Sequence, residues 1–239
     1  MRATVCLPTY NECENLPRMI AALAEVLREG DRVLVIDDAS PDGTGEIADR
    51  LAAEHAFVDV LHRPAKEGLG RAYVDGFRHV LATDEELVLE LDCDFSHDPK
   101  DVPRLIAAAE EGVDLVLGSR YVAGGGTRNW GLVRRLISRG GSLYTAFFLH
   151  MGVHDPTGGF KCFRRAVLER LDLESITPRG YAFQIETTYR VKQAGFRVVE
   201  IPITFIDREV GGSKMSRSIV VEGFWRVPTL RLAALRGKL

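Results

Sequence analysis

The sequence is poor in cysteine and has no long apolar run, and both absences narrow the class of protein. Its 239 residues contain only four cysteines, Cys6, Cys13, Cys93 and Cys162, without a C-x-x-C pair or a regular spacing. That pattern disfavours a zinc site or a disulfide framework and favours a reducing compartment. The first residues, MRATVCLPTYNE, lead directly into a strand-like segment, so we expect no secretory leader. The nearest candidate for a spanning helix, residues 143–149, is far shorter than the roughly 20 residues needed, and we expect no membrane crossing.

The chain also lacks a strong net charge and the common phosphate-binding motifs. A formal net charge of −3 argues against bulk binding of nucleic acid. Neither G-x-x-x-x-G-K-[ST] nor G-x-G-x-x-G is present, since Gly68, Gly70 and Gly76 have the wrong spacing. A P-loop NTPase and a Rossmann dehydrogenase are therefore disfavoured. The length is sufficient for one large domain or two small ones.

Short apolar segments alternate with helical patterns through the first half of the chain. We expect strands at residues 3–7, 32–36, 58–62, 86–91 and 114–117, and helices at residues 16–27, 45–54, 70–81 and 102–109. Strands that alternate with helices form βαβ units. The sequence therefore predicts an α/β fold with three α/β/α layers, Rossmann-like, around a mostly parallel sheet.

The second half is less regular. It is expected to hold a loop at 123–131, an amphipathic helix at 132–153, a helix around 183–193, a strand at 197–203 and a basic amphipathic tail at 218–239. Because no repeat or linker divides the chain, we expect residues 1–217 to form one domain and residues 218–239 to be its C-terminal helix.

Polar clusters follow four of the expected strands. In order they are PTYNE (8–12), DDASPDGT (37–44), RPAKEGLG (63–70) and DCDFSHD (92–98). Ligands of parallel α/β sheets bind at the carboxyl ends of the strands. We therefore expect the functional site at that edge of the sheet.

The fourth cluster is the most acidic. Asp92 and Asp94 offer two hard oxygen ligands that could hold Mg²⁺ or Mn²⁺, with substrate phosphates completing the coordination shell. The alternative is that these aspartates are solvated or cap the next helix. Asp98 fits the capping role, because Pro99 follows it at a first helical position. We expect His97 to be structural rather than catalytic.

The second and third clusters have the composition of a nucleotide site. Asp37 and Asp38 could accept hydrogen bonds from a ribose hydroxyl or a base N–H, whereas Asp42 is typical of a turn. Lys66 or Arg71 could lie near a phosphate. Helix packing alone would also explain the glycines of this loop.

Taken in order, the motifs resemble one family. PTYNE, DDASPDGT, GLGRAY, DCDFSHDP, GSRYVAGGG, NW and GGSK occur in sequence across residues 8–214. This ordered set resembles the dolichol- and polyprenol-phosphate mannose synthases, which are family-2 glycosyltransferases with a GT-A fold. The chain resembles their short soluble type, without added spanning helices or a fused domain. The resemblance implies inverting transfer of mannose from GDP-mannose to a polyprenyl monophosphate.

The same resemblance implies roles for individual residues. Asp92 and Asp94 would hold Mg²⁺ or Mn²⁺ on the donor diphosphate. The donor site would comprise Pro8, Tyr10, Glu12, Asp37, Asp38, Lys66, Asp92, Cys93 and Asp94. Arg120 and Arg134 would clamp the acceptor phosphate. Arg208 and Lys214 match a loop that closes over the phosphates, and together with Asp94 these four cations form the expected catalytic set.

The implied reaction requires no general base, and the sequence offers no Ser-His-Asp or Cys-His arrangement. A phosphate monoester, with a second pKa near 6, is already largely dianionic at pH 7 and can attack the anomeric carbon directly. The protein would then supply positioning and charge stabilisation. Arginine suits an acceptor phosphate because its planar fork binds two oxygens at once.

Two basic amphipathic stretches, residues 128–149 and 218–239, could lie on an anionic membrane. Helices that pack against a core show the same pattern. Since a polyprenyl lipid is insoluble in water, we expect a cytoplasmic protein in peripheral contact with the cytoplasmic face of a membrane. The sequence does not identify a protein partner.

Three alternatives remain open from the sequence. The donor could be UDP-glucose or another nucleotide sugar, and the acceptor a hydroxyl, which would require a general base. A nucleotidyltransferase would release pyrophosphate instead. A non-catalytic subunit would bind a nucleotide sugar without turnover.

Overall fold

The structure is a computed structural model that describes residues 1–176, 181–207 and 217–237. A seven-stranded sheet in the order β3-β2-β1-β4-β7-β5-β8 forms its centre, and β6 pairs with β9 in a second, two-stranded sheet. The strands are β1 (Ala3–Thr9), β2 (Arg32–Asp37), β3 (Val58–His62), β4 (Leu87–Glu90), β5 (Leu115–Ser119), β6 (Gly126–Arg128), β7 (Lys161–Arg164), β8 (Val198–Pro202) and β9 (Thr204–Ile206).

Eight α-helices connect these strands within the described residues. They are α1 (Asn15–Ala24), α2 (Thr44–Glu54), α3 (Leu69–Leu81), α4 (Val102–Glu110), α5 (Leu132–Leu149), α6 (Arg165–Arg170), α7 (Tyr181–Gln193) and α8 (Arg217–Leu235). Two short 3-10 helices, Pro99–Asp101 and Leu173–Ser175, complete the list.

The five strands and four helices expected in the first half are all present, which confirms the α/β prediction. The sheet is mostly parallel, but β7 runs antiparallel to both β4 and β5 and separates them. The sequence pattern did not reveal β7. The expected loop at 123–131 contains the short strand β6, and the helix expected to reach residue 153 ends at Leu149, where His150 adopts a left-handed conformation with φ 52°.

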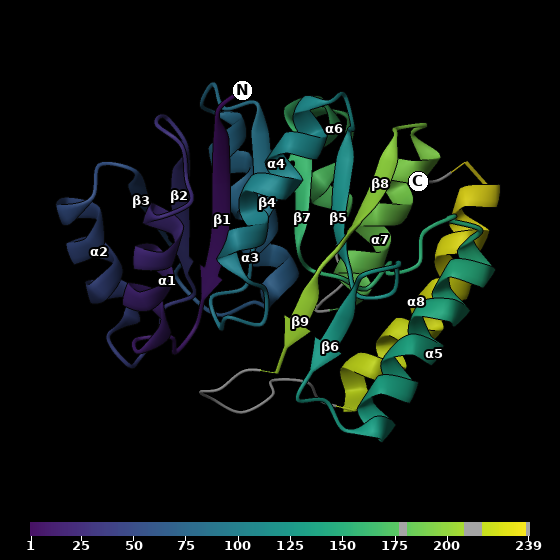
Figure 1. The fold of residues 1–239 in the computed structure, drawn as a ribbon. Coiled ribbons are helices and arrows are strands. Elements are labelled where there is room, and N and C mark those ends of the chain that lie inside the picture. The colour runs from purple at the N-terminus through teal and green to yellow at the C-terminus, as the bar shows by residue number, and fades with distance from the viewer. Residues whose placement is uncertain (177–180, 208–216, 238–239) are drawn as a thin grey trace.

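Helices cover both faces of the sheet, giving three layers (Figure 1). One face packs against α1, α2 and α4, and the other against α3, α6 and α7. Helix α1 shows why these residues form a helix here. Its buried Leu16, Met19, Ile20 and Leu23 recur at helical spacing and form one apolar stripe. β4 is buried at all four positions, as expected for a central strand covered on both faces.

Helices α5 and α8 lie side by side at one end of the sheet (Figure 1). α8 is attached to the core by the buried side chains of Val227 and Leu230. Tyr144 of α5 stacks on Phe224 of α8, with ring centroids 4.7 Å apart. Within the described ranges, no helix combines the length and apolar composition needed to cross a membrane.

Candidate active site

The acidic turn after β4 lies at the carboxyl edge of the sheet. Asp92 keeps 32% of its side chain exposed and accepts a hydrogen bond of 3.5 Å from the hydroxyl of Tyr73, a buried residue of α3. Asp94 is buried and accepts a hydrogen bond of 3.0 Å from the backbone N–H of Ser96. Phe95, which follows Asp94, has φ 58°, a left-handed conformation that turns the chain sharply. The turn thus presents two carboxylates within three residues.

The neighbours of this turn have structural roles. Asp98 caps the following 3-10 helix by accepting a hydrogen bond from Lys100 N–H, which confirms the capping prediction. Cys93 is buried, and its side chain packs into the hydrophobic core. His97 is buried, and this burial lowers its pKa to about 4; the carboxylate of Asp94 opposes the effect. A neutral imidazole fits the expected structural role.

Asp37 is committed to the turn after β2. Its carboxylate accepts hydrogen bonds from Ser40 N–H at 3.1 Å, Ser40 Oγ at 2.6 Å and Thr9 Oγ1 at 3.3 Å. A Cβ on Gly45 would lie only 3.0 Å from Asp37 Oδ2, so a side chain there would press on this carboxylate. Asp37 therefore shapes the loop after β2, and its carboxylate is already engaged in hydrogen bonds within the protein.

Asp38 forms a buried ion pair with Arg63, a residue to which the sequence pattern assigned no role. Arg63 also binds Asp75 at 2.7 Å and Glu67 at 3.0 Å, so one guanidinium joins three carboxylates. Burial raises the pKa of Asp38, while Arg63 opposes that rise. Arg63 thereby holds Asp38 in place at the end of β2.

The remaining donor-site candidates cluster around β1. Pro8 lies near the end of β1, and the following Tyr10 carries Lys66 over its ring, with the ammonium 3.6 Å from the centroid. Glu12 accepts a hydrogen bond of 2.8 Å from Asn15 Nδ2. Its backbone N–H donates to Thr44 Oγ1 at 3.0 Å, which ties this loop to the start of α2. The first, second and third clusters therefore form one continuous edge.

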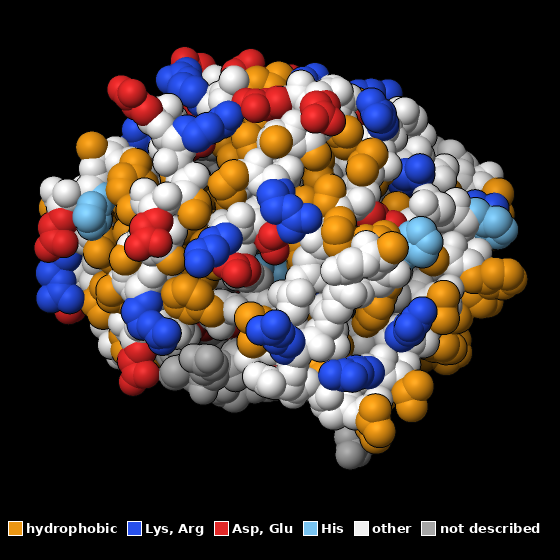
Figure 2. All heavy atoms as spheres, viewed as in Figure 1, with side chains coloured by type: hydrophobic (Ala, Val, Ile, Leu, Met, Phe, Trp, Pro, Cys, Tyr) orange, Lys and Arg blue, Asp and Glu red, His pale blue; other side chains and the backbone are white. Residues whose placement is uncertain are grey.

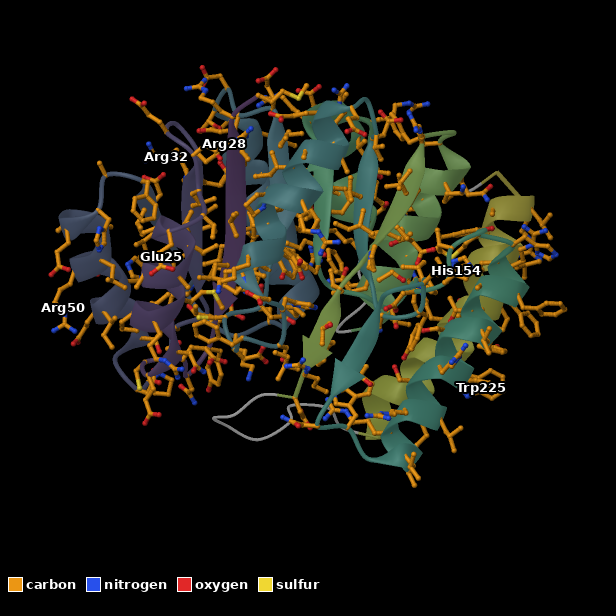
Figure 3. The ribbon with its side chains drawn as sticks, in the orientation of Figure 1. Glu25, Arg28, Arg32, Arg50, His154 and Trp225 are labelled. Atoms are coloured by element: carbon orange, nitrogen blue, oxygen red, sulfur yellow. The ribbon has the colours of Figure 1, made fainter. Side chains whose placement is uncertain are left out.

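Arg120 follows β5 and is fixed by Asp155, which the sequence pattern did not single out. The two side chains form a bidentate pair, Nε to Oδ2 at 2.7 Å and Nη2 to Oδ1 at 2.6 Å, and Nη2 also donates to Thr157 Oγ1 at 2.8 Å. Burial of Asp155 would raise its pKa, but Arg120 outweighs that effect and the pKa of Asp155 is lowered. Glu200 anchors the same loop by accepting hydrogen bonds from the backbone N–H groups of His154 and Asp155 at 2.7 and 2.8 Å; Figure 3 labels His154.

Phe205 of β9 connects the acidic turn to the arginines. Its ring contacts His97 at 5.1 Å and Trp130 at 5.2 Å between centroids, and the Arg120 guanidinium lies 5.6 Å from its centroid. Arg134 lies over the ring of Trp130, 4.3 Å from its centroid. Thus β9, which was not expected from the sequence, connects the acidic turn after β4 to Arg120 after β5.

Arg134 projects from the first turn of α5 and is a third exposed. Its Nη1 donates to Asp207 Oδ2 at 2.6 Å. Arg208 and Lys214, the other two cations expected in the catalytic set, lie outside the described residues.

The chemistry of the acidic turn fits a divalent cation. In the part of the chain that the structure describes, no three His, Cys, Asp or Glu side chains form a complete metal site. Asp92 and Asp94 are two hard oxygen donors, and Asp92 is open to solvent. A pair of carboxylates that leaves positions for phosphate oxygens is the usual way in which Mg²⁺ is bound with a nucleotide.

An α/β sheet with two aspartates and a pair of arginines at its carboxyl edge has the composition of a binding site for phosphorylated ligands. The family model of glycosyl transferase family 2 matches residues 4–172, and the chain belongs to that family. Two relatives match along nearly the whole chain. An undecaprenyl-phosphate mannosyltransferase of Micrococcus luteus is 47% identical over 234 residues, 98% of this chain and 96% of the relative. A polyprenol monophosphomannose synthase of Mycolicibacterium smegmatis is 45% identical over 239 residues, 100% of this chain and 89% of the relative.

Solved structures support the same fold. A glucosyl-3-phosphoglycerate synthase from Mycobacterium tuberculosis matches with a TM-score of 0.70 at 21% identity, covering 96% of this chain and 79% of that one. The mannosyltransferase PcManGT from Pyrobaculum calidifontis, in complex with GDP-Man and Mn²⁺, matches with a TM-score of 0.61 at 19% identity, covering 99% and 74%. At these identities the likeness concerns the fold alone. Together the comparisons confirm the resemblance inferred from the ordered motifs.

Proposed function

We propose that this chain is an inverting glycosyltransferase that moves mannose from GDP-mannose to a polyprenyl monophosphate. The observation that carries the proposal is the full-length similarity to two proteins whose names specify mannose and a polyprenyl phosphate. The structural neighbour that holds GDP-Man and Mn²⁺ on the same fold supports the choice of donor and of a divalent cation. Either Mg²⁺ or Mn²⁺ suits two carboxylates.

Asp92 and Asp94 would hold this cation, whose chemistry is to neutralise charge on the departing diphosphate. Tyr73 orients Asp92 through its hydroxyl, and the turn at Phe95 keeps Asp94 beside it. On the other side of β1, Asp38 and the Tyr10–Lys66 pair would contact the nucleoside and its phosphates.

The acceptor phosphate would approach from the side of α5. Arg134 is accessible there, and Arg120 is held rigidly by Asp155 behind it. Arg134 would offset part of the repulsion between a dianionic acceptor and an anionic donor, whereas Asp155 already balances the charge of Arg120, which would act mainly as a fixed hydrogen-bond donor. His97 is buried and neutral, which suits a reaction in which the acceptor arrives already deprotonated.

The lipid acceptor requires contact with a membrane, and α5 and α8 present a suitable surface. Large apolar side chains are exposed on both helices: Leu132, Val133, Leu136, Ile137, Leu143, Phe147 and Phe148 on α5, and Phe224, Trp225, Leu232 and Leu235 on α8. Figures 2 and 3 show hydrophobic side chains along this outer edge, with Trp225 among them and Lys and Arg side chains beside them. We call these residues the α5–α8 apolar surface. Such a surface supports peripheral binding to an anionic bilayer, on the cytoplasmic face where nucleotide sugars are available.

The test is direct transfer of labelled mannose. Purified protein is incubated with Mn²⁺, a polyprenyl phosphate and a panel of labelled nucleotide sugars, and butanol-extractable label is counted. We expect label from GDP-mannose only, abolished by EDTA and restored by Mg²⁺ or Mn²⁺. Label from UDP-glucose alone would overturn the donor, and nucleotide-sugar binding without transfer to any lipid phosphate would indicate a binding subunit.

Two variants of the same acidic segment sharpen this test. Asp94→Asn removes a proposed metal ligand and should lower kcat by about 100-fold or more. Asp98→Asn is the matched control, because asparagine caps a helix as well as aspartate does. Equal activity of Asp94→Asn and Asp98→Asn would argue against the metal site.

A further inference from the structure

A buried polar cluster lies beneath the acidic turn and has no role in the proposal so far. Glu90 ends β4, and its cross-strand neighbour on β7 is Lys161. Gln184 comes from α7. All three residues are at most 3% exposed. Polar groups are rarely buried this deeply without partners, so each hydrogen bond in the cluster carries information about its purpose.

Lys161 fixes the orientation of the Gln184 amide. Its ammonium donates to the backbone carbonyl of Gln184 at 3.0 Å and also to the side-chain Oε1 of the same residue. An ammonium is only a donor, so the amide oxygen must face Lys161 and the amide nitrogen must face away. The nitrogen, Nε2, makes no hydrogen bond of normal geometry with the residues that the structure describes. Gln184 lies near enough to Glu90 to oppose the rise in pKa that burial causes at that carboxyl, but an amide nitrogen carries two N–H groups, so this weak contact leaves donor capacity for a ligand.

Gly159 leaves space beside this amide nitrogen. A Cβ built on Gly159 would lie 3.3 Å from Gln184 Nε2 and 3.9 Å from Asp92 Oδ2, which are among its nearest neighbours. A side chain at residue 159 would therefore separate the amide from the acidic turn. Because residue 159 is a glycine, Gln184 Nε2 and the proposed metal ligand Asp92 border the same small space.

We propose that Gln184 Nε2 donates a hydrogen bond to a hydroxyl of the hexosyl group of the donor, over Gly159. The inference rests on the proposed function, since it places the transferred sugar next to the cation that Asp92 would hold. A sugar hydroxyl fits better than a phosphate oxygen, because the carboxylate of Asp92 borders the space and disfavours an anion there. Lys161 is then a positioning residue, which acts by holding the amide in the donating orientation.

A buried N–H group that finds a well-aligned acceptor in the sugar discriminates between ligands with and without that hydroxyl. The affinity for GDP-mannose should therefore depend on Gln184, and the affinity for GDP should not. Calorimetry with Mn²⁺ and the full chain measures both dissociation constants. We expect Gln184→Met to weaken GDP-mannose about tenfold and to change GDP by less than about twofold. Gln193→Met, at the exposed end of the same helix, is the matched control and should change neither.

Gly159→Ala provides a second variant, in which Gln184, Lys161 and Glu90 are all retained. Its methyl group would occupy the space over Gly159 at tight but tolerable distances, so the fold should survive, as a thermal melt would verify. It should weaken GDP-mannose selectively, as Gln184→Met does. Equal weakening of GDP and GDP-mannose by both variants, or no weakening by either, would overturn the proposal.

The transfer assay separates this inference from the proposed function. Mannose transfer by the wild type without a selective affinity loss in the variants would overturn the Gln184 contact alone. A selective affinity loss without transfer to any lipid phosphate would support the contact and overturn the function. Failure of the wild type to bind GDP-mannose would overturn both.

Discussion

The guanidinium of Arg120 and the carboxylate of Asp155 face each other in the buried part of the site, joined by two hydrogen bonds of 2.7 and 2.6 Å. The residues are 35 positions apart, so this pair connects the end of β5 to the loop before β7. Asp155 is completely buried, and Arg120 nearly so. Their pairing fixes an arginine that would otherwise be too costly to bury.

Asp155→Asn should therefore lower the free energy of unfolding by about 3–5 kcal/mol, because it leaves a buried guanidinium without its counter-charge. Denaturant unfolding measures this loss. Asp59→Asn breaks an exposed pair with Arg32 and should cost less than about 1 kcal/mol. A similar small loss in both variants would mean that the buried pair is no more important than the surface one.

The same pair has a defined pH dependence. Because pairing lowers the pKa of Asp155, its stabilisation is fully present above the ordinary pKa of an aspartate, 3.8, and is lost as the pH falls through the lowered value. The stability difference between wild type and Asp155→Asn should accordingly be constant near neutral pH and shrink in strong acid. A difference that shrank on raising the pH would contradict this assignment.

Glu186 of α7 should hold α8 in place. Its carboxylate accepts hydrogen bonds from Arg190 at 2.9 and 2.6 Å and from Arg226 of α8 at 3.1 and 2.8 Å. Glu186→Gln removes the charge from this junction and should destabilise the protein by about 2–3 kcal/mol. Hydrogen exchange should rise selectively at residues 224–235. Glu169→Gln, which affects an exposed pair with Arg165, is the control and should leave exchange in α8 unchanged.

Arg63 should control the charge of Asp38. In Arg63→Met the buried carboxylate loses its cation, so the pKa of Asp38 should rise further. If charged Asp38 contacts the nucleoside, its contribution to affinity is present above its pKa and lost as the pH falls through it. Arg63→Met should then weaken GDP about tenfold near neutral pH and displace the fall in affinity to higher pH. Arg32→Met, at the opposite end of β2, is the control, and identical pH profiles for both variants would refute the role of Arg63.

The α5–α8 apolar surface should be required for membrane binding. Leu136 and Phe147 are about three-quarters exposed, and a glutamate at either position should reduce flotation with phosphatidylglycerol vesicles about tenfold. Ala53→Glu adds the same charge on α2, at the far end of the sheet, and should float like the wild type. Transfer to a short, detergent-solubilised acceptor should persist in all three variants. Flotation equal to that of Ala53→Glu would exclude this surface.

Much of the fold could be predicted because its signals are local. Alternating strands and helices are encoded in the spacing of apolar residues within about ten positions. β7 was missed for the opposite reason. It is only four residues long, and its antiparallel place between β4 and β5 depends on pairing with segments 44 or more residues away. β9 is shorter still, and nothing in three residues indicates a strand.

The same distinction between local and long-range signals applies to the residues of the site. Asp92 and Asp94 could be proposed as metal ligands from their position after a buried strand, and the ordered motifs identified the family. Asp155, Arg63 and Phe205 could not be identified, because each acts through a partner far away in the sequence. A buried aspartate in DPTGGF is an ordinary turn residue until the structure places it against Arg120.

The sequence alone determined the α/β class, the edge of the sheet where the polar clusters gather and the family, since apolar periodicity, strand-end polarity and ordered motifs are all written along the chain. Tertiary structure alone decided which charges are neutralised. Whether Asp38 is bound by Arg63, Arg120 by Asp155, or Gln184 by Lys161 depends on distances between elements that only packing establishes. Electrostatic effects fall with distance and grow with burial, and neither quantity can be read from sequence order.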